Sequence, residues 1–242
     1  MTKCRYFKYC IRAAHAALAM AIIFGFTCNG TANSRYRLYI SPMIGFGSTD
    51  WSLLIASCKG KPTHATNPDP DGIYNCDLST LQMAAPIAAG DSGLTLGAVI
   101  GYHISPIFAA EIRVLRFPKT SVHFDPSFNY YHEKYGINAI ESNTTTVSAT
   151  GKFITPILHS SYFAYANAGV NCTHRHDLLA NTYHITPTFG LGLGRRLNDS
   201  IDLSVEFTYM SGIGRATNMP AEDYIPFLYS IHARLDIGLP TA

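Results

Sequence analysis

Residues 93–103 read GLTLGAVIGYH, and their side chains alternate in character. The even-numbered positions from Leu94 to Tyr102 are apolar or aromatic, whereas the odd-numbered positions are mostly Gly, Thr or His. Successive side chains of a β-strand point to opposite sides, so this alternation predicts a strand with one apolar face and one small or polar face.

The same alternation recurs along the chain. Residues 201–209 set Ile, Leu, Val, Phe and Tyr against Asp, Ser, Glu and Thr, and residues 229–238 repeat the pattern. Similar segments lie at 36–47 and 108–114, and weaker ones at 146–154, 162–171 and 183–197. Eight segments of about ten residues predict an all-β fold, an eight-stranded antiparallel up-and-down transmembrane β-barrel.

The connections between these segments alternate in length. Short turns are predicted at 105–106, 156–161 and 198–200, and long loops at 48–92, 118–143, 172–181 and 210–224. Short periplasmic turns and long outer loops are typical of outer-membrane barrels, and an even number of strands returns both termini to the periplasm.

Alternation alone also fits a soluble sandwich or a soluble ligand-binding barrel, whose apolar faces would form a core. Three features favour an apolar face that meets lipid. The long loops all fall at one end, and the polar face is rich in Gly and charge. In addition, aromatic residues recur near strand ends, where an interfacial girdle would lie: Tyr36, Phe46, Tyr102, Phe117, Tyr209 and Tyr229.

The N-terminal segment has the layout of a secretory signal. Four basic residues and no acid precede or flank an apolar run that ends near Phe26, and Gly30-Thr31-Ala32 follows. This predicts a cleaved helical signal peptide at residues 1–32 and a barrel domain at residues 33–242. Removing four of the 18 basic and none of the 16 acidic residues leaves a net charge of −2. No basic patch therefore favours nucleic acid.

Charges on the predicted polar faces nearly cancel. An eight-stranded barrel is just wide enough for side chains to fill it, and buried charges must pair. We therefore predict an ion-pair network that plugs the lumen, although several of these groups could instead be solvated near the rim. The predicted members are Arg37, Glu111, Arg113, Lys152, Asp202, Glu206, Arg234 and Asp236.

Three of the six cysteines remain after the predicted signal. Cys58 and Cys76 could form a disulfide in an oxidising compartment, which would stabilise the chain by about 3 kcal/mol in the chain-entropy model. Cys172 is then left over, and the sequence leaves its state open.

The chain resembles the OmpA-like outer-membrane β-barrel superfamily, including the small surface barrels of OmpX and opacity type, over about residues 36–239. The resemblance rests on residues 97–102 before a Ser-Pro turn, residues 187–194 before Leu197-Asn198-Asp199, and the closing strand 227–239. It implies an outer-membrane location, contact with outer-membrane lipid and lipopolysaccharide, and the barrel-assembly machinery as a partner. The chain departs from the family in ending Leu239-Pro240-Thr241-Ala242 instead of on an aromatic residue, which weakens the assembly signal.

Catalytic, metal and cofactor sites are not expected. His103 with Ser105, and His159 with Ser160 and Ser161, lack an orienting carboxylate and lie at predicted periplasmic turns. His174 and His176 would point the same way on an extended segment, but they lack further metal ligands at a recognisable spacing. Gly190, Gly192 and Gly194 alternate with apolar residues inside a strand, where they would make room for bulky lumen neighbours.

The sequence therefore favours a non-enzymatic outer-membrane barrel with a structural or surface-interaction role, such as adhesion, host contact or envelope integrity, carried by its loops. A barrel that transports small or hydrophobic solutes is the alternative. A lipid-modifying enzyme is a third hypothesis.

Overall fold

The computed structural model describes residues 37–51, 86–90, 92–124, 136–157, 161–214 and 223–239. Every regular element in these ranges is a β-strand, and none of their segments is a helix that is long and apolar enough to cross a membrane. The strands are β1 (Leu38–Asp50), β2 (Pro86–Gly90), β3 (Ser92–Ser105), β4 (Phe108–Arg116), β5 (Thr120–Phe124), β6 (Ala139–Pro156), β7 (Tyr162–His176), β8 (Asn181–Arg196), β9 (Ile201–Met210) and β10 (Phe227–Gly238).

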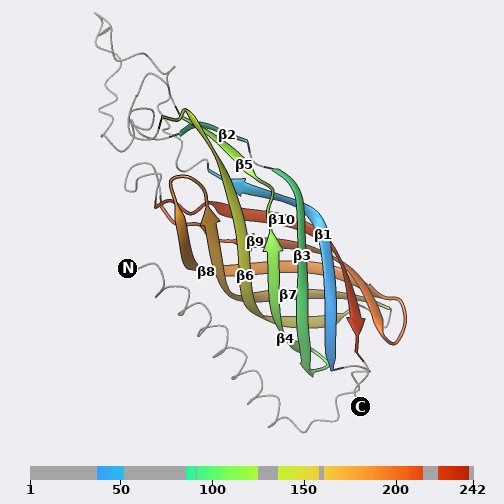
Figure 1. The fold of residues 1–242 in the computed structure, drawn as a ribbon. Helices are drawn as coiled ribbons and strands as arrows, with labels where there is room; N and C mark the ends of the chain where they lie inside the picture. The colour runs from blue at the N-terminus through green and yellow to red at the C-terminus, as the bar shows by residue number, and fades with distance from the viewer. Residues whose placement is uncertain are drawn as a thin grey trace, which may run out of the picture.

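Eight strands close into a barrel in the order β1-β3-β4-β6-β7-β8-β9-β10, and every neighbouring pair is antiparallel. The seam is formed by β10 and β1, which lie side by side in Figure 1 and pair from Tyr39↔Gly238 to Asp50↔Phe227. The predicted all-β, eight-stranded fold is therefore confirmed. The predicted signal peptide at residues 1–32 lies outside the described residues.

One end of the barrel, here called the turn end, carries tight connections. Pro106 and Ile107 join β3 to β4, and the side chain of Asn198 accepts a hydrogen bond from the backbone of Ser200 at 2.8 Å between β8 and β9. The chain also enters β1 and leaves β10 here, since the Leu239 backbone N–H donates to Leu38 O at 2.8 Å. Two of the predicted short turns thus lie at the same end of the barrel, beside the start of β1 and the end of β10.

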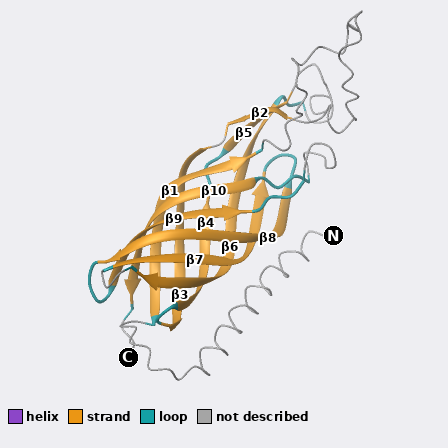
Figure 2. Ribbon diagram, turned by 180° about the vertical axis from the view of Figure 1, so that it is seen from behind, coloured by secondary structure: helices purple, strands orange, loops and turns teal. Residues whose placement is uncertain are grey.

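The opposite end, the loop end, contains more strand than the sequence predicted. β2 and β5 lie inside the first two predicted loops, where they extend the wall beyond the closed barrel by pairing with each other and, through β5, with the start of β6 (Figure 2). The third predicted loop, 172–181, is wrong: β7 continues to His176, β8 begins at Asn181, and only four residues join them.

Inward and outward faces follow the predicted alternation. Outward Phe46 and Leu191 are 73% and 64% exposed, whereas inward Thr95 and Glu206 are fully buried. The outward run of β10 from Tyr229 to Ile237 spans about 26 Å along the strand and about 20 Å across a membrane at a tilt of about 40°, close to the ~25 Å apolar band of such barrels. A closed barrel leaves no unpaired backbone edge in lipid. The strands therefore form a closed barrel with the outward apolar band of a membrane-spanning barrel.

The aromatic girdle is only partly as predicted. Tyr209 packs outside the barrel near its loop end against Phe227 and Tyr229, with ring centroids 6.4 and 5.3 Å away. The prediction that Phe117 belongs to the girdle is wrong, because Phe117 is 4% exposed and belongs to an interior cluster. The inward alternation of Arg113 and Leu115 continues past the end of β4 and carries Phe117 inside with them.

Candidate functional site: a charged cluster inside the barrel

Two tyrosines enter the lumen in its turn-end half because glycines face them across the wall. A Cβ at Gly101 would fall on the ring of Tyr39, and a Cβ at Gly192 would fall on the ring of Tyr165. Gly194 and Gly190 leave comparable room for Phe163 and Asn167. The prediction that the glycines of residues 190–194 make room for bulky lumen side chains is therefore confirmed.

Arg234 on β10 is the centre of the charged cluster. Its guanidinium donates to Glu111 through Nη2 at 2.6 Å and through Nη1 at 3.1 Å, which is a two-point contact with one carboxylate. It also donates to Asp236 at 2.5 Å and to Glu206 at 3.3 Å. One buried cation thus contacts three carboxylates from β4, β9 and β10, which a planar guanidinium with five N–H groups can do.

Two further cations balance these carboxylates. Arg113 pairs with Glu206 and, at 3.3 Å, with Glu111, and Lys152 lies 3.3 Å from Asp236 and 3.5 Å from Glu111. The cluster therefore holds three cations and three carboxylates, and none of the six side chains is more than 6% exposed.

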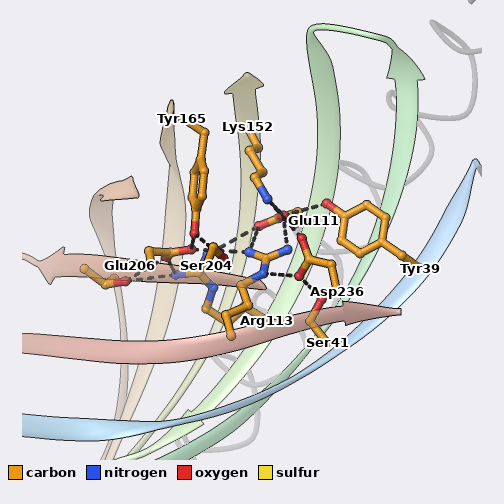
Figure 3. Close-up of polar contacts among 11 residues, drawn as sticks. Tyr39, Ser41, Glu111, Arg113, Lys152, Tyr165, Ser204, Glu206 and Asp236 are labelled. Carbon is orange, nitrogen blue, oxygen red and sulfur yellow. Dashed lines mark hydrogen bonds and ion pairs between the residues drawn. The ribbon is translucent and has the colours of Figure 1, made fainter. Parts of the chain in front are cut away.

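Neutral hydroxyl groups complete the cluster (Figure 3). Tyr39 donates to Glu111 at 2.6 Å, and Tyr165 donates to Glu206 at 2.9 Å. Ser41 donates to Asp236 at 2.6 Å, and the ammonium of Lys152 lies 4.0 Å from the Tyr165 ring centroid. Buried ion pairs are tolerated when the remaining polar atoms are also hydrogen-bonded, and this arrangement meets most of that requirement.

The structure brings six of the eight proposed network residues together. Arg37 is exposed at the turn end, where its backbone carbonyl accepts a hydrogen bond from the His103 N–H at 2.7 Å. Asp202 pairs at 3.5 Å with Arg196, an exposed residue of β8. The cluster also includes five hydroxyl residues that the predicted network lacks: Tyr39, Ser41, Tyr165, Ser204 and Thr208.

An apolar cluster lies in the lumen toward the loop end. Its members come from β1, β3, β4, β9 and β10 and from the residue just after β4, and each is at most 4% exposed. They are Met43, Val99, Leu115, Phe117, Met210 and Leu228. The polar face therefore changes character along the barrel axis, from paired charges in the turn-end half to packed hydrophobic side chains above them.

A third group of residues covers the loop end of the lumen. Arg175 of β7 pairs with Asp177 at 2.6 Å, donates to the Tyr224 carbonyl at 2.7 Å and lies 4.7 Å over the Trp51 ring. The same Trp51 and Tyr224 pack with Val122, Phe124 and Ile140. Burial raises the pKa of the Tyr224 hydroxyl well above its usual range, so this group stays protonated and donates to the Asp50 carbonyl at 2.9 Å.

We expect Arg175→Ala to loosen this cover. The change removes an ion pair, a hydrogen bond and a stacking contact, and it leaves Asp177 buried without its cation, a loss that typically costs about 3–5 kcal/mol. Trp51 is the single tryptophan of the chain and is 1% exposed, so its fluorescence reports on this site alone. The expected result is a red-shifted emission and stronger quenching by acrylamide.

Arg195→Ala is the matched control for this measurement. Arg195 is an exposed arginine at the turn end that also lies over an aromatic ring, 5.5 Å from Tyr162. It should leave the Trp51 emission unchanged. An unchanged spectrum in Arg175→Ala as well would show that Arg175 does not hold the cover together.

The remaining sequence candidates are placed as follows. His103 lies beside Tyr39 with ring centroids 4.9 Å apart, and His159 and Ser160 fall outside the described residues. His174 and His176 do share the outward face of β7, at 6.0 Å, but in the described part of the chain no three His, Cys, Asp or Glu residues form a group that could hold a metal. Cys172 is disulfide-bonded, and the proposed bridge between Cys58 and Cys76 lies outside the described residues.

No family model and no curated protein matches the chain. Among solved structures, it is similar to Neisserial surface protein A, at 11% identity over 84% of this chain and 97% of that one, with a TM-score of 0.46. It is also similar to the outer membrane protein OprG from Pseudomonas aeruginosa, at 14% identity over 86% and 100% of the two chains with a TM-score of 0.46. The outer membrane protein AlkL in lipid bilayers matches at 14% identity over 88% and 96%, with a TM-score of 0.47. At such identities a likeness concerns the fold alone.

Proposed function

We propose that the protein is a non-enzymatic, non-conducting anchor in the outer membrane whose loop end faces the cell exterior and carries a structural or surface-interaction role, such as adhesion or envelope integrity. The observation that supports this proposal is the balanced charged cluster around Arg234, which fills the turn-end half of the lumen. The apolar cluster, and the residues around Arg175 and Trp51 at the loop end, would obstruct the same lumen at two further levels.

The wall that β2, β5 and the start of β6 build beyond the barrel supports the outward-facing part of the proposal. These strands extend the loop end of the wall beyond the apolar belt. Binding partners of such a surface would be host or matrix molecules, which the loops would contact without any passage through the barrel.

Conductance of the purified protein in planar lipid bilayers tests the closed lumen. We expect no ohmic conductance above the bilayer baseline for the wild-type chain, because the charged cluster, the apolar cluster and the residues around Arg175 would obstruct a water-filled path at three levels. An open porin reconstituted in the same bilayers serves as the positive control. Steady single-channel steps from the wild-type protein would contradict the proposal.

Transport of hydrophobic molecules is the second candidate function. It is favoured by the apolar cluster, which lies inside the barrel near the end of β4 and would suit a hydrophobic solute. Vesicles that contain the protein would then take up a hydrophobic fluorescent dye faster than protein-free vesicles. Equal uptake rates would leave the anchor role as the better account.

A further inference from the structure

Two histidines lie next to each other on the outward face of β7 near its loop end. His174 is partly buried and His176 is exposed, and Arg175 between them points into the lumen. Their ring centroids are 6.0 Å apart. Two metal–nitrogen bonds of about 2.0–2.1 Å place the centroids of two imidazoles on one ion roughly 5–6 Å apart. The two rings are therefore spaced to bind one metal ion together.

The neighbouring strand β8 fixes one of the two rings. His174 is opposite Tyr183 and stacks on its ring, with centroids 4.2 Å apart and planes 6° from parallel. The Nε2 of His174 lies 2.9 Å from the Oδ1 of Asn181. An amide oxygen only accepts hydrogen bonds, so Nε2 carries the proton and Nδ1 keeps its lone pair. A hydrogen-bond acceptor on the non-ligating nitrogen is the usual arrangement of a histidine that binds a metal.

The groups around the two histidines determine which ions they can hold. His176 is opposite Asn143 of β6 and Asn181 of β8, which are both uncharged. Cys172, the next outward residue of β7 toward the apolar belt, is disulfide-bonded and offers no thiolate. Among the described residues no third His, Cys, Asp or Glu joins the two histidines in a metal-binding group. Two neutral imidazoles suit Cu²⁺, Ni²⁺ or Zn²⁺, whereas Mg²⁺ and Ca²⁺ prefer oxygen ligands.

The two histidines lie above the lipid-facing belt. Cys172 is opposite the apolar Val147 and Ile185, which are 42% and 48% exposed. The outward residues opposite His174 and His176 are all polar or aromatic: Thr145, Tyr183, Asn143 and Asn181. A hydrated ion can therefore reach the two rings without crossing lipid or the lumen.

We propose that His174 and His176 form a binding site for one divalent transition-metal ion at the outer surface of β7. The Nδ1 of His174 and one ring nitrogen of His176 bind the ion, and water molecules occupy its remaining coordination positions. Cu²⁺ is the ion that binds most tightly, because the affinities of nitrogen ligands for divalent metals are highest for copper. The site needs only the outward faces of β7 and β8, so it does not depend on whether the lumen is closed.

Titration of the tag-free, folded chain in detergent with Cu²⁺, followed by electron paramagnetic resonance, tests the site. We expect a bound ion whose spectrum shows coupling to the nitrogens of two imidazoles. His174→Gln and His176→Gln should each weaken the binding by more than about tenfold and remove the coupling to one imidazole. Asn181→Ala removes the acceptor of the Nε2 proton, so it should weaken the binding about tenfold while both imidazoles stay coupled.

His123→Gln is the matched control, because His123 is an exposed histidine of β5 at the same end of the barrel. It should bind Cu²⁺ as the wild type does. The proposal is overturned by unchanged binding in His176→Gln, by an equal loss in His123→Gln, or by a wild-type spectrum without two coupled imidazoles. Unchanged binding in Asn181→Ala would contradict Nδ1 of His174 as the ligand atom. Each variant is first checked for the fast-migrating unboiled band of a folded barrel, so that misfolding is not mistaken for loss of the site.

Discussion

Replacing Arg234 by methionine is expected to destabilise the barrel by about 3–5 kcal/mol, the usual cost of removing one partner from a buried ion pair. Methionine keeps most of the side-chain volume and removes the charge that contacts Glu111, Glu206 and Asp236. The three carboxylates then face only Arg113 and Lys152. Urea unfolding of the protein in vesicles, followed by the mobility of unboiled samples on gels, measures the loss.

A double variant tells whether charge balance is the cause. Arg234→Met combined with Glu111→Gln leaves two cations and two carboxylates, so it should recover a large part of the stability lost in Arg234→Met. A double variant that is as unstable as the sum of the single variants would mean that the cluster does not act as a balanced unit.

Gly45→Ala is expected to prevent normal closure of the barrel at the seam of β1 and β10. Gly45 is opposite His232, and an added Cβ would fall on the carbonyl oxygen of Ile231 and 2.7 Å from the Cα of His232. Both contacts are with backbone atoms, so no rotamer change can relieve them. Overpacking usually costs about 1–3 kcal/mol, and a clash with backbone belongs at the upper end. The fraction of heat-modifiable protein after refolding measures the effect.

Gly151→Ala is the control for Gly45→Ala. Its nearest neighbours are the tip of the Phe108 ring at 3.0 and 3.2 Å, on the outward face where the ring can turn aside into lipid. Refolding should therefore match the wild type. Equal refolding of Gly45→Ala would contradict the close approach of the two strands at the seam.

The sequence predicted the lipid-facing part of the barrel well because its two faces meet different surroundings. Leu203, Val205 and Phe207 alternate with Ser204 and Glu206 since lipid is on one side and the charged lumen on the other. Beyond the belt both faces are polar, so the alternation vanishes while the strand continues. This is why the sequence predicts a loop at His174, Arg175 and His176 although β7 includes them.

The membership of the charged cluster was predictable in part. Glu111, Arg113 and Arg234 share the inward positions of clear strands, and a balanced set of charges there must pair. The prediction leaves out Tyr39 and Tyr165 because it counts only charged side chains, whereas each tyrosine hydroxyl donates to a carboxylate of the cluster. Counting alternate positions from Arg113 would also have placed Phe117 inside the barrel.

The central claim is that the strands form a closed barrel whose apolar face meets outer-membrane lipid. It is tested most directly by fractionating expressing cells, washing the membranes with carbonate or urea, and running the outer-membrane fraction on gels with and without boiling. We expect the protein to resist the wash and to migrate faster unboiled than boiled. A band that the wash releases into the soluble fraction would contradict the lipid-facing assignment.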